Sequence, residues 1–313
     1  MTGAERKLWQ TINKSMNNRT KTGIKLALLT ALISGLANFL NKEVLISGVD
    51  AVSLTLVKNT LVGLGFLAIL FVSFKKLPKI KLKEIWKLLT VALVGGSISF
   101  LLFFKGLSLA SATTGSLIHK SLFLWVALLA FIFLGEKFKK YQLAALGLLA
   151  LGLVLLSKIT NFSFGRGELM MLIATLLWSL EVIFVKKFLK NTNFKILAAA
   201  RMFLGSLFIL GFVLLGGQTL HITDISASGW LKILVVAGFL FGYVFTWYKA
   251  LSLAPANLVT SILTLALPIT ILGDQISARA IPTLNLFFGI LLFTLAIYSL
   301  LKLNPWRKEL INN

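Results

Sequence analysis

The chain has 313 residues, of which 58% are hydrophobic and only 13% are charged, and it contains no cysteine. A soluble domain carries about 25% charged residues, so this composition excludes a soluble fold and predicts a membrane protein with several spans. The formal net charge of +22 does not indicate nucleic-acid binding, because no soluble module is long enough to carry that function. The lack of cysteine excludes disulfides and thiolate-bound metals.

Ten apolar stretches are long enough to cross a membrane, for which a helix needs roughly 20 residues. Before them, residues 1–21 form a basic tail, for which a short interfacial helix and a flexible segment are both open interpretations. The predicted spans are 22–41, 51–74, 86–108, 112–134, 141–157, 168–188, 196–215, 230–253, 256–273 and 283–302, and a short tail, 303–313, follows them. The fold class is therefore an all-α integral membrane protein with ten transmembrane helices, because a barrel would show alternating strands.

Positive charge is divided unequally between the two sets of loops. The set that includes both termini and loop 75–87 holds 21 Lys and Arg residues, whereas the opposite loops hold five. Cytoplasmic loops collect Lys and Arg. We therefore expect an integral protein of the cytoplasmic (inner) membrane, with both termini in the cytoplasm.

The two halves of the chain repeat each other. Residues 105–112 (KGLSLASA) and 249–256 (KALSLAPA) are identical at six of eight positions, at an offset of 144. At nearly the same offset, Lys58 in the second span corresponds to Arg201 in the seventh. Each repeat has five spans, and an odd number inverts the second copy in the membrane. Inverted repeats of this kind are common in secondary transporters.

These features resemble the drug/metabolite transporter superfamily, specifically its EamA type with ten helices in two five-helix repeats. The residues that carry the resemblance are Lys58, Arg201, the segments 105–112 and 249–256, Leu134-Gly135-Glu136 and Leu177-Trp178-Ser179. It implies EamA-like repeats over 22–160 and 165–302, a central cavity opened alternately to each side, and transport of small metabolites such as amino acids or amphipathic compounds.

Two departures from the family pattern affect the fourth helix of each repeat. The proline usual in this helix is present as Pro268 in the second copy, whereas the first has Leu122 nearby. The ninth span is also shorter than the fourth. We expect it to be less tilted, broken or partly re-entrant.

Polar side chains inside the spans are the candidates for substrate binding or gating. An ionisable side chain within a bilayer costs about 2.5–3.5 kcal/mol on insertion scales, so its presence needs a reason. The candidates are Lys58, Arg201, Lys120, Asn38, Asn59 and Trp178. For the two asparagines the alternative is a hydrogen bond between helices, and for the tryptophan it is ordinary packing.

Glu181 and His119 are the candidates for proton coupling. Glu181 lies near the middle of the sixth span, where a protonatable carboxylate is a usual proton carrier. The alternative is a structural ion pair with Lys58, Lys120 or Arg201. For His119 the alternative is a buried histidine with its hydrogen bonds satisfied, although its side chain titrates close to neutral pH.

The sequence thus predicts a secondary transporter that moves a small organic metabolite, such as an amino acid or another amphipathic or anionic solute, by alternating access. The alternative is a flippase of lipid-linked substrates, or an exporter of drug-like compounds, on the same architecture. An enzyme is not expected, because the chain lacks HExxH, nucleotide-binding and triad patterns. The expected partners are a small-molecule substrate, the lipid bilayer and a coupling proton. No nucleic acid, cofactor or metal is expected, and a homodimer stays open.

Overall fold

The structure is a computed structural model that describes residues 3–74, 81–136, 138–156, 165–217, 219–279, 281 and 284–302. All regular elements within these ranges are helices. They are α1 (Gly3–Ile46), α2 (Ala51–Ser73), α3 (Leu82–Thr90), η1 (Val91–Ile98), α4 (Ser99–Leu109), α5 (Ala112–Lys120), α6 (Leu122–Leu134), α7 (Lys140–Leu156), α8 (Arg166–Phe188), α9 (Phe194–Ala199), η2 (Ala200–Leu204), α10 (Gly205–Leu215), α11 (Ala227–Leu253), α12 (Ala256–Leu263), α13 (Ala266–Ser277) and α14 (Leu284–Lys302). The segments η1 and η2 are π-helices.

The helices confirm the predicted all-α membrane fold. In the described ranges, nine helical segments are long and apolar enough to cross a membrane, and α7, with 17 residues, is a shorter apolar helix at the predicted fifth span. Large apolar side chains stay uncovered on the outside of the bundle, such as Leu215 and Val72, each 89% exposed. Such a surface suits lipid, which solvates apolar side chains and leaves backbone groups to be satisfied inside the helices.

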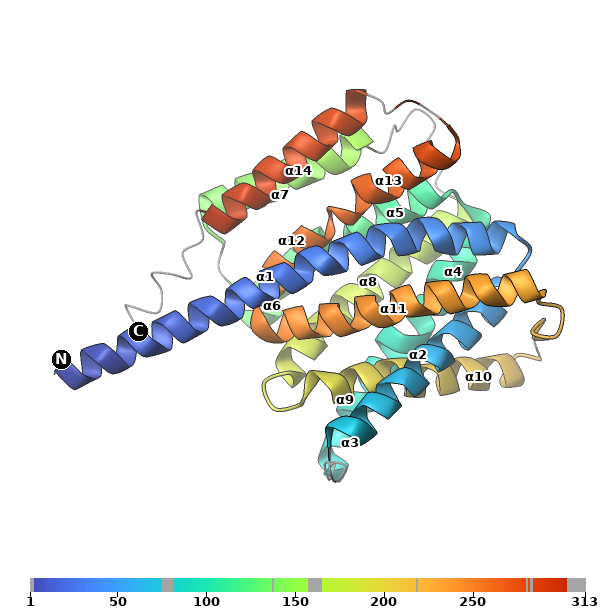
Figure 1. Cartoon of the computed structure of the whole chain (residues 1–313), viewed down its shortest axis with the longest axis horizontal. Helices are drawn as coiled ribbons and strands as arrows, with labels where there is room; N and C mark the ends of the chain where they lie inside the picture. The colour runs from blue at the N-terminus through green and yellow to red at the C-terminus, as the bar shows by residue number, and fades with distance from the viewer. Residues whose placement is uncertain are drawn as a thin grey trace.

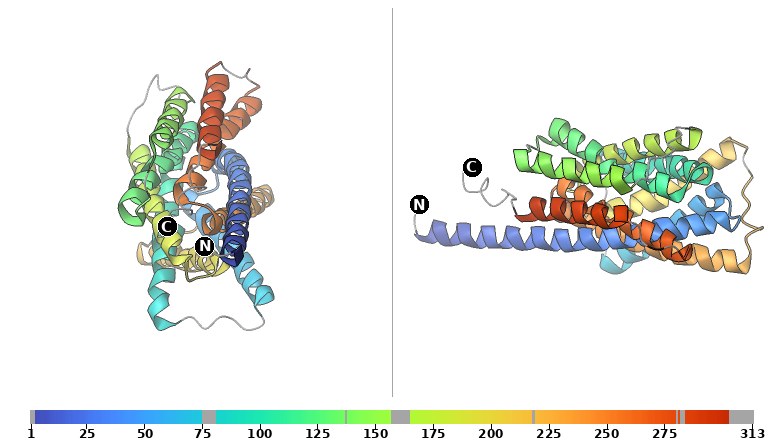
Figure 2. Two further views of the ribbon diagram at one scale, coloured as in Figure 1. Left: turned by 90° about the vertical axis from the view of Figure 1, so that its left-hand side faces the viewer. Right: turned by 90° about the horizontal axis from the view of Figure 1, so that it is seen from above.

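The basic N-terminal segment is part of the first helix. Helix α1 begins at Gly3 and runs unbroken to Ile46, so that it projects beyond the bundle (Figures 1 and 2). The expected separate interfacial helix or flexible tail is therefore not found. The chain has no proline before Pro78, and nothing else stops the helical hydrogen bonding between the two parts. The C-terminal tail 303–313 lies outside the described residues.

The fourth helix is broken in both repeats. In the second repeat, α12 and α13 are separated at Thr264 and Leu265, upstream of Pro268, which cannot donate a helical hydrogen bond. In the first repeat, α5 and α6 are separated at Ser121 without a proline, by a tighter turn in which Leu124 N donates to Ser121 O. Of the three alternatives left open for the ninth span, the structure has the broken helix, and a similar break occurs in the fourth span.

The two repeats pack in an inverted, two-fold manner. The first helix of each repeat lies against the third helix of the other, so that α1 packs on α11 and α8 packs on α4. The last helices, α7 and α14, pack on each other. Figures 1 and 2 show the start of α1 and the end of α14 at one end of the bundle and the connection between α10 and α11 at the other.

In the centre of the bundle, the π-helix η1 approaches η2 and the first residue of α10 at two glycines. A Cβ at Gly96 would lie 1.8 Å from the carbonyl oxygen of Arg201, and one at Gly205 would lie 2.7 Å from the carbonyl oxygen of Gly96. Only glycine permits this approach of the two backbones. The contact brings Arg201 into the centre of the molecule.

Candidate functional site

A cavity of about 650 Å³, which includes space open to solvent, lies between the two repeats. Its walls come from the first, second, third and fourth helices of the first repeat and from the corresponding first three helices of the second. The lining residues are Ser34, Ala37, Asn38, Asn41, Lys58, Phe100, Phe103, Phe104, His119, Leu122, Trp178, Glu181, Val182, Arg201, Leu240, Tyr243 and Trp247. A cavity with aromatic walls and a few polar groups is typical of a small-molecule site.

Lys58 presents a buried ammonium group to this cavity. Helix α2 begins after Asp50, whose carboxylate accepts the N–H groups of Val52 and Ser53, and Lys58 lies two turns further on. Its Nζ donates to Asn41 Oδ1 over 2.7 Å and lies 3.7 Å from the centroid of the Phe104 ring. Among the described residues no carboxylate lies within ion-pair distance of this ammonium. Its partners are therefore neutral: one amide oxygen and one aromatic face.

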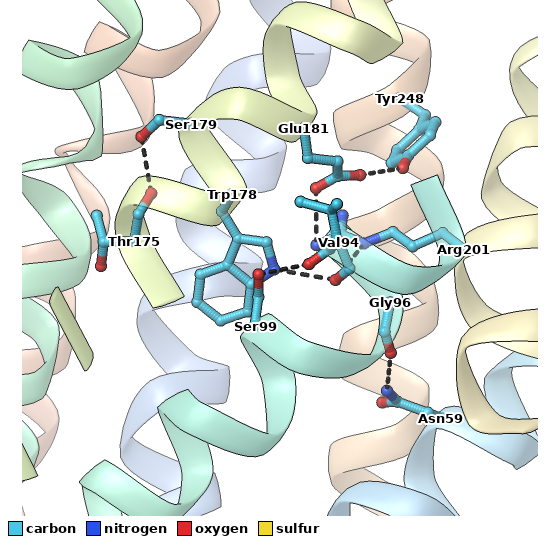
Figure 3. Close-up of polar contacts among 11 residues, drawn as sticks. Asn59, Val94, Gly96, Ser99, Thr175, Trp178, Ser179, Glu181, Arg201 and Tyr248 are labelled. Atoms are coloured by element: carbon cyan, nitrogen blue, oxygen red, sulfur yellow. Dashed lines mark hydrogen bonds and ion pairs between the residues drawn. The ribbon is translucent and has the colours of Figure 1, made fainter. Parts of the chain in front are cut away.

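Glu181 lies between Arg201 and Tyr248 (Figure 3). Its Oε2 is 3.4 Å from Arg201 Nη2, and Tyr248 donates a short hydrogen bond to its Oε1. The Glu181 and Arg201 side chains are 2% and 4% exposed. The alternative of an ion pair, left open by the sequence, is thus realised with Arg201, and neither Lys58 nor Lys120 lies within ion-pair distance of Glu181.

The carbonyl of Gly95, in η1, fixes two more side chains of the site. It accepts a 3.0 Å hydrogen bond from Trp178 Nε1 and a 3.3 Å hydrogen bond from Arg201 Nε. Side chains can use a backbone oxygen here because a π-helix disturbs the regular α-helical bonding, which is frequent at functional sites. The Arg201 Nη1 atom is buried and has no hydrogen-bond partner. One side of the guanidinium is therefore held by the protein, and its Nη1 has unused hydrogen-bonding capacity.

The predicted site residues divide into two groups. Those that line the cavity are Lys58, Arg201, Asn38, Trp178, Glu181 and His119. Lys120 and Asn59 lie behind the walls. The Lys120 ammonium donates to Ser34 Oγ over 2.9 Å, and Asn59 Nδ2 donates to Gly96 O over 3.2 Å. Asn59 thus makes the hydrogen bond between helices that was its alternative role.

His119 packs against the aromatic wall of the cavity. Its ring centroid lies 4.8 Å from that of Trp178 and 5.3 Å from that of Phe103. Its Nδ1 is buried and has no hydrogen-bond partner, so the alternative of a fully satisfied histidine does not hold at this atom.

Several residues of the site did not stand out in the sequence. Asn41 holds Lys58, Tyr248 holds Glu181, and Tyr243 and Phe104 belong to the wall. Asn41 lies at the polar end of the first predicted span, where an asparagine is expected simply as a helix-end residue. Tyr248 is 67 residues away in sequence from Glu181, the residue it contacts. No local pattern marks such pairs. No group of three or more metal-ligating side chains occurs within the described ranges.

Comparison with known families agrees with this geometry. The sequence model of the EamA-like transporter family matches the chain twice, over residues 21–158 and 165–302. The chain belongs to the EamA-like transporter family. This EamA-like protein is therefore an integral membrane transporter of small solutes, as the apolar spans and the repeats predicted.

A solved structure that is described only as the crystal structure of a protein is similar to this EamA-like chain in fold. The two share 17% sequence identity at a TM-score of 0.73, over 91% of this chain and 99% of the other. At this identity the likeness extends to the fold alone. None of the curated proteins compared with the chain matches it.

Proposed function

We propose that this protein is a secondary transporter that carries a small organic anion, or an amphipathic solute with an anionic group, across the cytoplasmic membrane by alternating access. The observation that carries the proposal is the buried Lys58 ammonium in the cavity between the repeats, with an amide and an aromatic ring as its partners. A buried charge without a counter-charge is costly. A bound anion would offset that cost.

The rest of the cavity supports the same class of substrate. Arg201 and Lys58 bring two positive charges to the lining, and Glu181 brings one negative charge. The unpartnered Nη1 of Arg201 offers a second donor to an anionic group. The rings of Phe100, Trp178 and Trp247 offer an apolar surface to the remainder of the solute. This charge balance disfavours organic cations.

Alternating access rests on the inverted repeats. The cavity lies where the repeats meet, and two halves of similar structure but opposite orientation can close either end by exchanging conformations. The excess of Lys and Arg in the loops on the side of the termini supports a cytoplasmic location for both termini. We further propose that Glu181 carries a coupling proton, because it lines the cavity and pairs with Arg201, which a bound anion would also contact. An anion on the guanidinium would weaken its hold on the carboxylate and favour protonation.

Flux into proteoliposomes tests the proposal. Purified protein is offered radiolabelled small carboxylates, amino acids and organic cations, and lipid flipping is measured in the same vesicles. We expect carboxylate flux without lipid flipping, and Lys58→Met should lower the affinity at least about 30-fold, the equivalent of about 2 kcal/mol. Lys25→Met is the matched control, since Lys25 is an exposed residue of α1. Transport of cations alone, or lipid flipping without solute flux, would contradict the proposal.

A further inference from the structure

Lys42 joins the end of the first helix to the junction between the third and fourth helices of its repeat. Its Nζ donates to Leu107 O over 3.1 Å and to Ala110 O over 2.9 Å. These carbonyls stand at the C-terminal end of α4, where the last backbone oxygens of a helix have no partner within the helix. A cation at this end also interacts favourably with the helix dipole. Lys42 therefore caps α4 from a neighbouring helix.

Lys186 makes the same contact in the second repeat. Its Nζ donates to Leu251 O and to Ala254 O, each over 2.7 Å, at the C-terminal end of α11. The offset between the two contacts is again 144 positions for each residue involved: Lys186, Leu251 and Ala254 correspond to Lys42, Leu107 and Ala110. The capped junctions also match in conformation, with Ala110 at φ −129°, ψ 174° and Ala254 at φ −135°, ψ 158°. The two lysine contacts are therefore structurally equivalent, with one in each repeat.

The two contacts lie at opposite ends of the bundle. Figure 1 shows the C-terminal ends of α1 and α8, which carry the two lysines, at opposite ends. The inversion of the repeats requires this arrangement. One contact therefore faces each side of the membrane.

Each lysine also stands close in sequence to a group that lines the cavity. Lys42 follows Asn41, which holds the Lys58 ammonium. Lys186 lies one helical turn after Val182, which lines the cavity next to Glu181. Movement of either helix end would thus be transmitted directly to the binding site.

The contact of Lys186 has an additional acidic partner. Glu136 attracts Lys186 electrostatically, and the backbone N–H groups of Ala256 and Asn257, at the start of α12, lie near enough to the Glu136 carboxyl group to favour its charged form. The junction between α11 and α12 is thus held at its carbonyl groups by the lysine, and the glutamate lies beside both the lysine and the start of α12. Glu136 belongs to the Leu134-Gly135-Glu136 segment noted in the sequence.

We propose that Lys42 and Lys186 are equivalent clamps, each of which closes the cavity at its own face of the membrane and is released in turn during transport. The inference rests on the proposed alternating access. Both clamps are engaged in this structure. Loss of either one should favour the conformation that is open at its face, and the clamps act on access to the site, not on the substrate itself.

Cysteine labelling tests this directly, because the native chain has no cysteine. Ala37→Cys places one thiol in the cavity wall, and a membrane-impermeant maleimide is added to right-side-out or inside-out vesicles. We expect Lys42→Met to raise the labelling rate about tenfold from the face of the α4–α5 junction only. Lys186→Met should do the same from the opposite face only. A tenfold change corresponds to about 1.4 kcal/mol, which the loss of two charge-assisted hydrogen bonds is sufficient to supply.

Conservative and control variants separate gating from general loosening. Lys42→Arg and Lys186→Arg can still donate to two carbonyls and should restore the native labelling rates. Lys25→Met and Lys187→Met, at exposed positions of the same helices, should change neither rate. Each variant is first checked for a monodisperse folded peak by size-exclusion chromatography, and Lys42→Gln or Lys186→Gln, which also removes the charge, replaces a methionine variant that does not fold.

The outcomes distinguish this inference from the proposed function. Equal rises from both faces, or no change in either methionine variant, would overturn the clamps. Labelling of the Ala37→Cys parent, which keeps both lysines, from both faces would then leave alternating access standing. Labelling of every variant from one face alone would overturn alternating access as well. One-sided rises at opposite faces, reversed by arginine, would support the clamps.

Discussion

Arg201 and Glu181 form an ion pair in the wall of the cavity, with 3.4 Å between Nη2 and Oε2 and both side chains almost fully buried. They come from different spans, α8 and the π-helix η2, and Gly95 of a third span bonds the same guanidinium. The pair therefore joins three spans as well as serving the site. Substitution of one of the two residues leaves the other as a buried charge without its partner.

Arg201→Met should accordingly destabilise the protein, by about 3–5 kcal/mol, the usual cost of breaking a buried pair. The double variant Arg201→Met/Glu181→Gln should recover most of that loss, because no uncompensated carboxylate remains. Lys58→Met should cost little stability, since its partners are neutral. Thermal unfolding of purified protein in detergent measures all three. Equal destabilisation in the single and double Arg201 variants would show that packing of Arg201, not its charge, matters.

Glu181→Gln should abolish accumulation driven by a pH gradient and leave exchange of substrate intact. The amide keeps the shape of the side chain but cannot carry a proton. Tyr248→Phe is the matched control, because it removes the hydrogen bond to Glu181 and keeps the carboxylate. Proteoliposomes loaded at two pH values make the measurement. A Glu181→Gln variant that accumulates substrate as well as the native protein would leave Glu181 with a structural role only.

Gly96→Ala should prevent the close contact of η1 and η2. The added Cβ would meet the carbonyl oxygen of Arg201 at 1.8 Å, so the backbones must separate, at a cost of about 1–3 kcal/mol or more. Gly147→Ala is the control, because nothing lies within 4 Å of its Cβ position in α7, and alanine favours a helix over glycine by about 1 kcal/mol. Thermal unfolding should show opposite shifts for the two variants.

The loops at the two ends of the bundle should be labelled from opposite sides of the membrane. Asn191 and Thr219 are exposed residues of connections on either side of the seventh span. In intact cells, an impermeant thiol reagent should modify Thr219→Cys and spare Asn191→Cys until the membrane is permeabilised. The reverse result would invert the orientation proposed from the charge pattern, and labelling of both from outside would contradict the inverted repeats.

Glu136 should make stability depend on pH. Burial raises the pKa of Glu136 above its ordinary value of 4.5, while Lys186 and the N–H groups of Ala256 and Asn257 act in the opposite direction. The folded protein therefore binds this proton more readily than the unfolded chain, and the contribution of the group to stability falls as pH rises from about 4.5 through the folded pKa. Glu136→Gln should remove this part of the pH dependence of thermal unfolding. If the pH dependence of thermal unfolding is the same in Glu136→Gln as in the native protein, other groups cause it.

The sequence by itself determined the class of the protein, its spans and its two repeats. These follow from properties that are local along the chain: an apolar run long enough to cross a bilayer, a bias in loop charge, and a recurrence at an offset of 144. Most of the polar lining, including Lys58, Arg201 and Glu181, was also predicted, because an ionisable residue within an apolar span is conspicuous for its cost.

Only the tertiary structure decided which of these residues meet. Lys58 could have paired with Glu181 by composition alone, yet it bonds to Asn41 while Arg201 takes the carboxylate. The clamp lysines bind carbonyl oxygens 65 and 68 residues further along the chain, and every residue has such an oxygen, so no side-chain pattern marks them. Partners across helices depend on helix rotation and on glycine contacts such as Gly96 with Arg201. Those are settled by the packing of the whole bundle, which a local reading of the sequence does not contain.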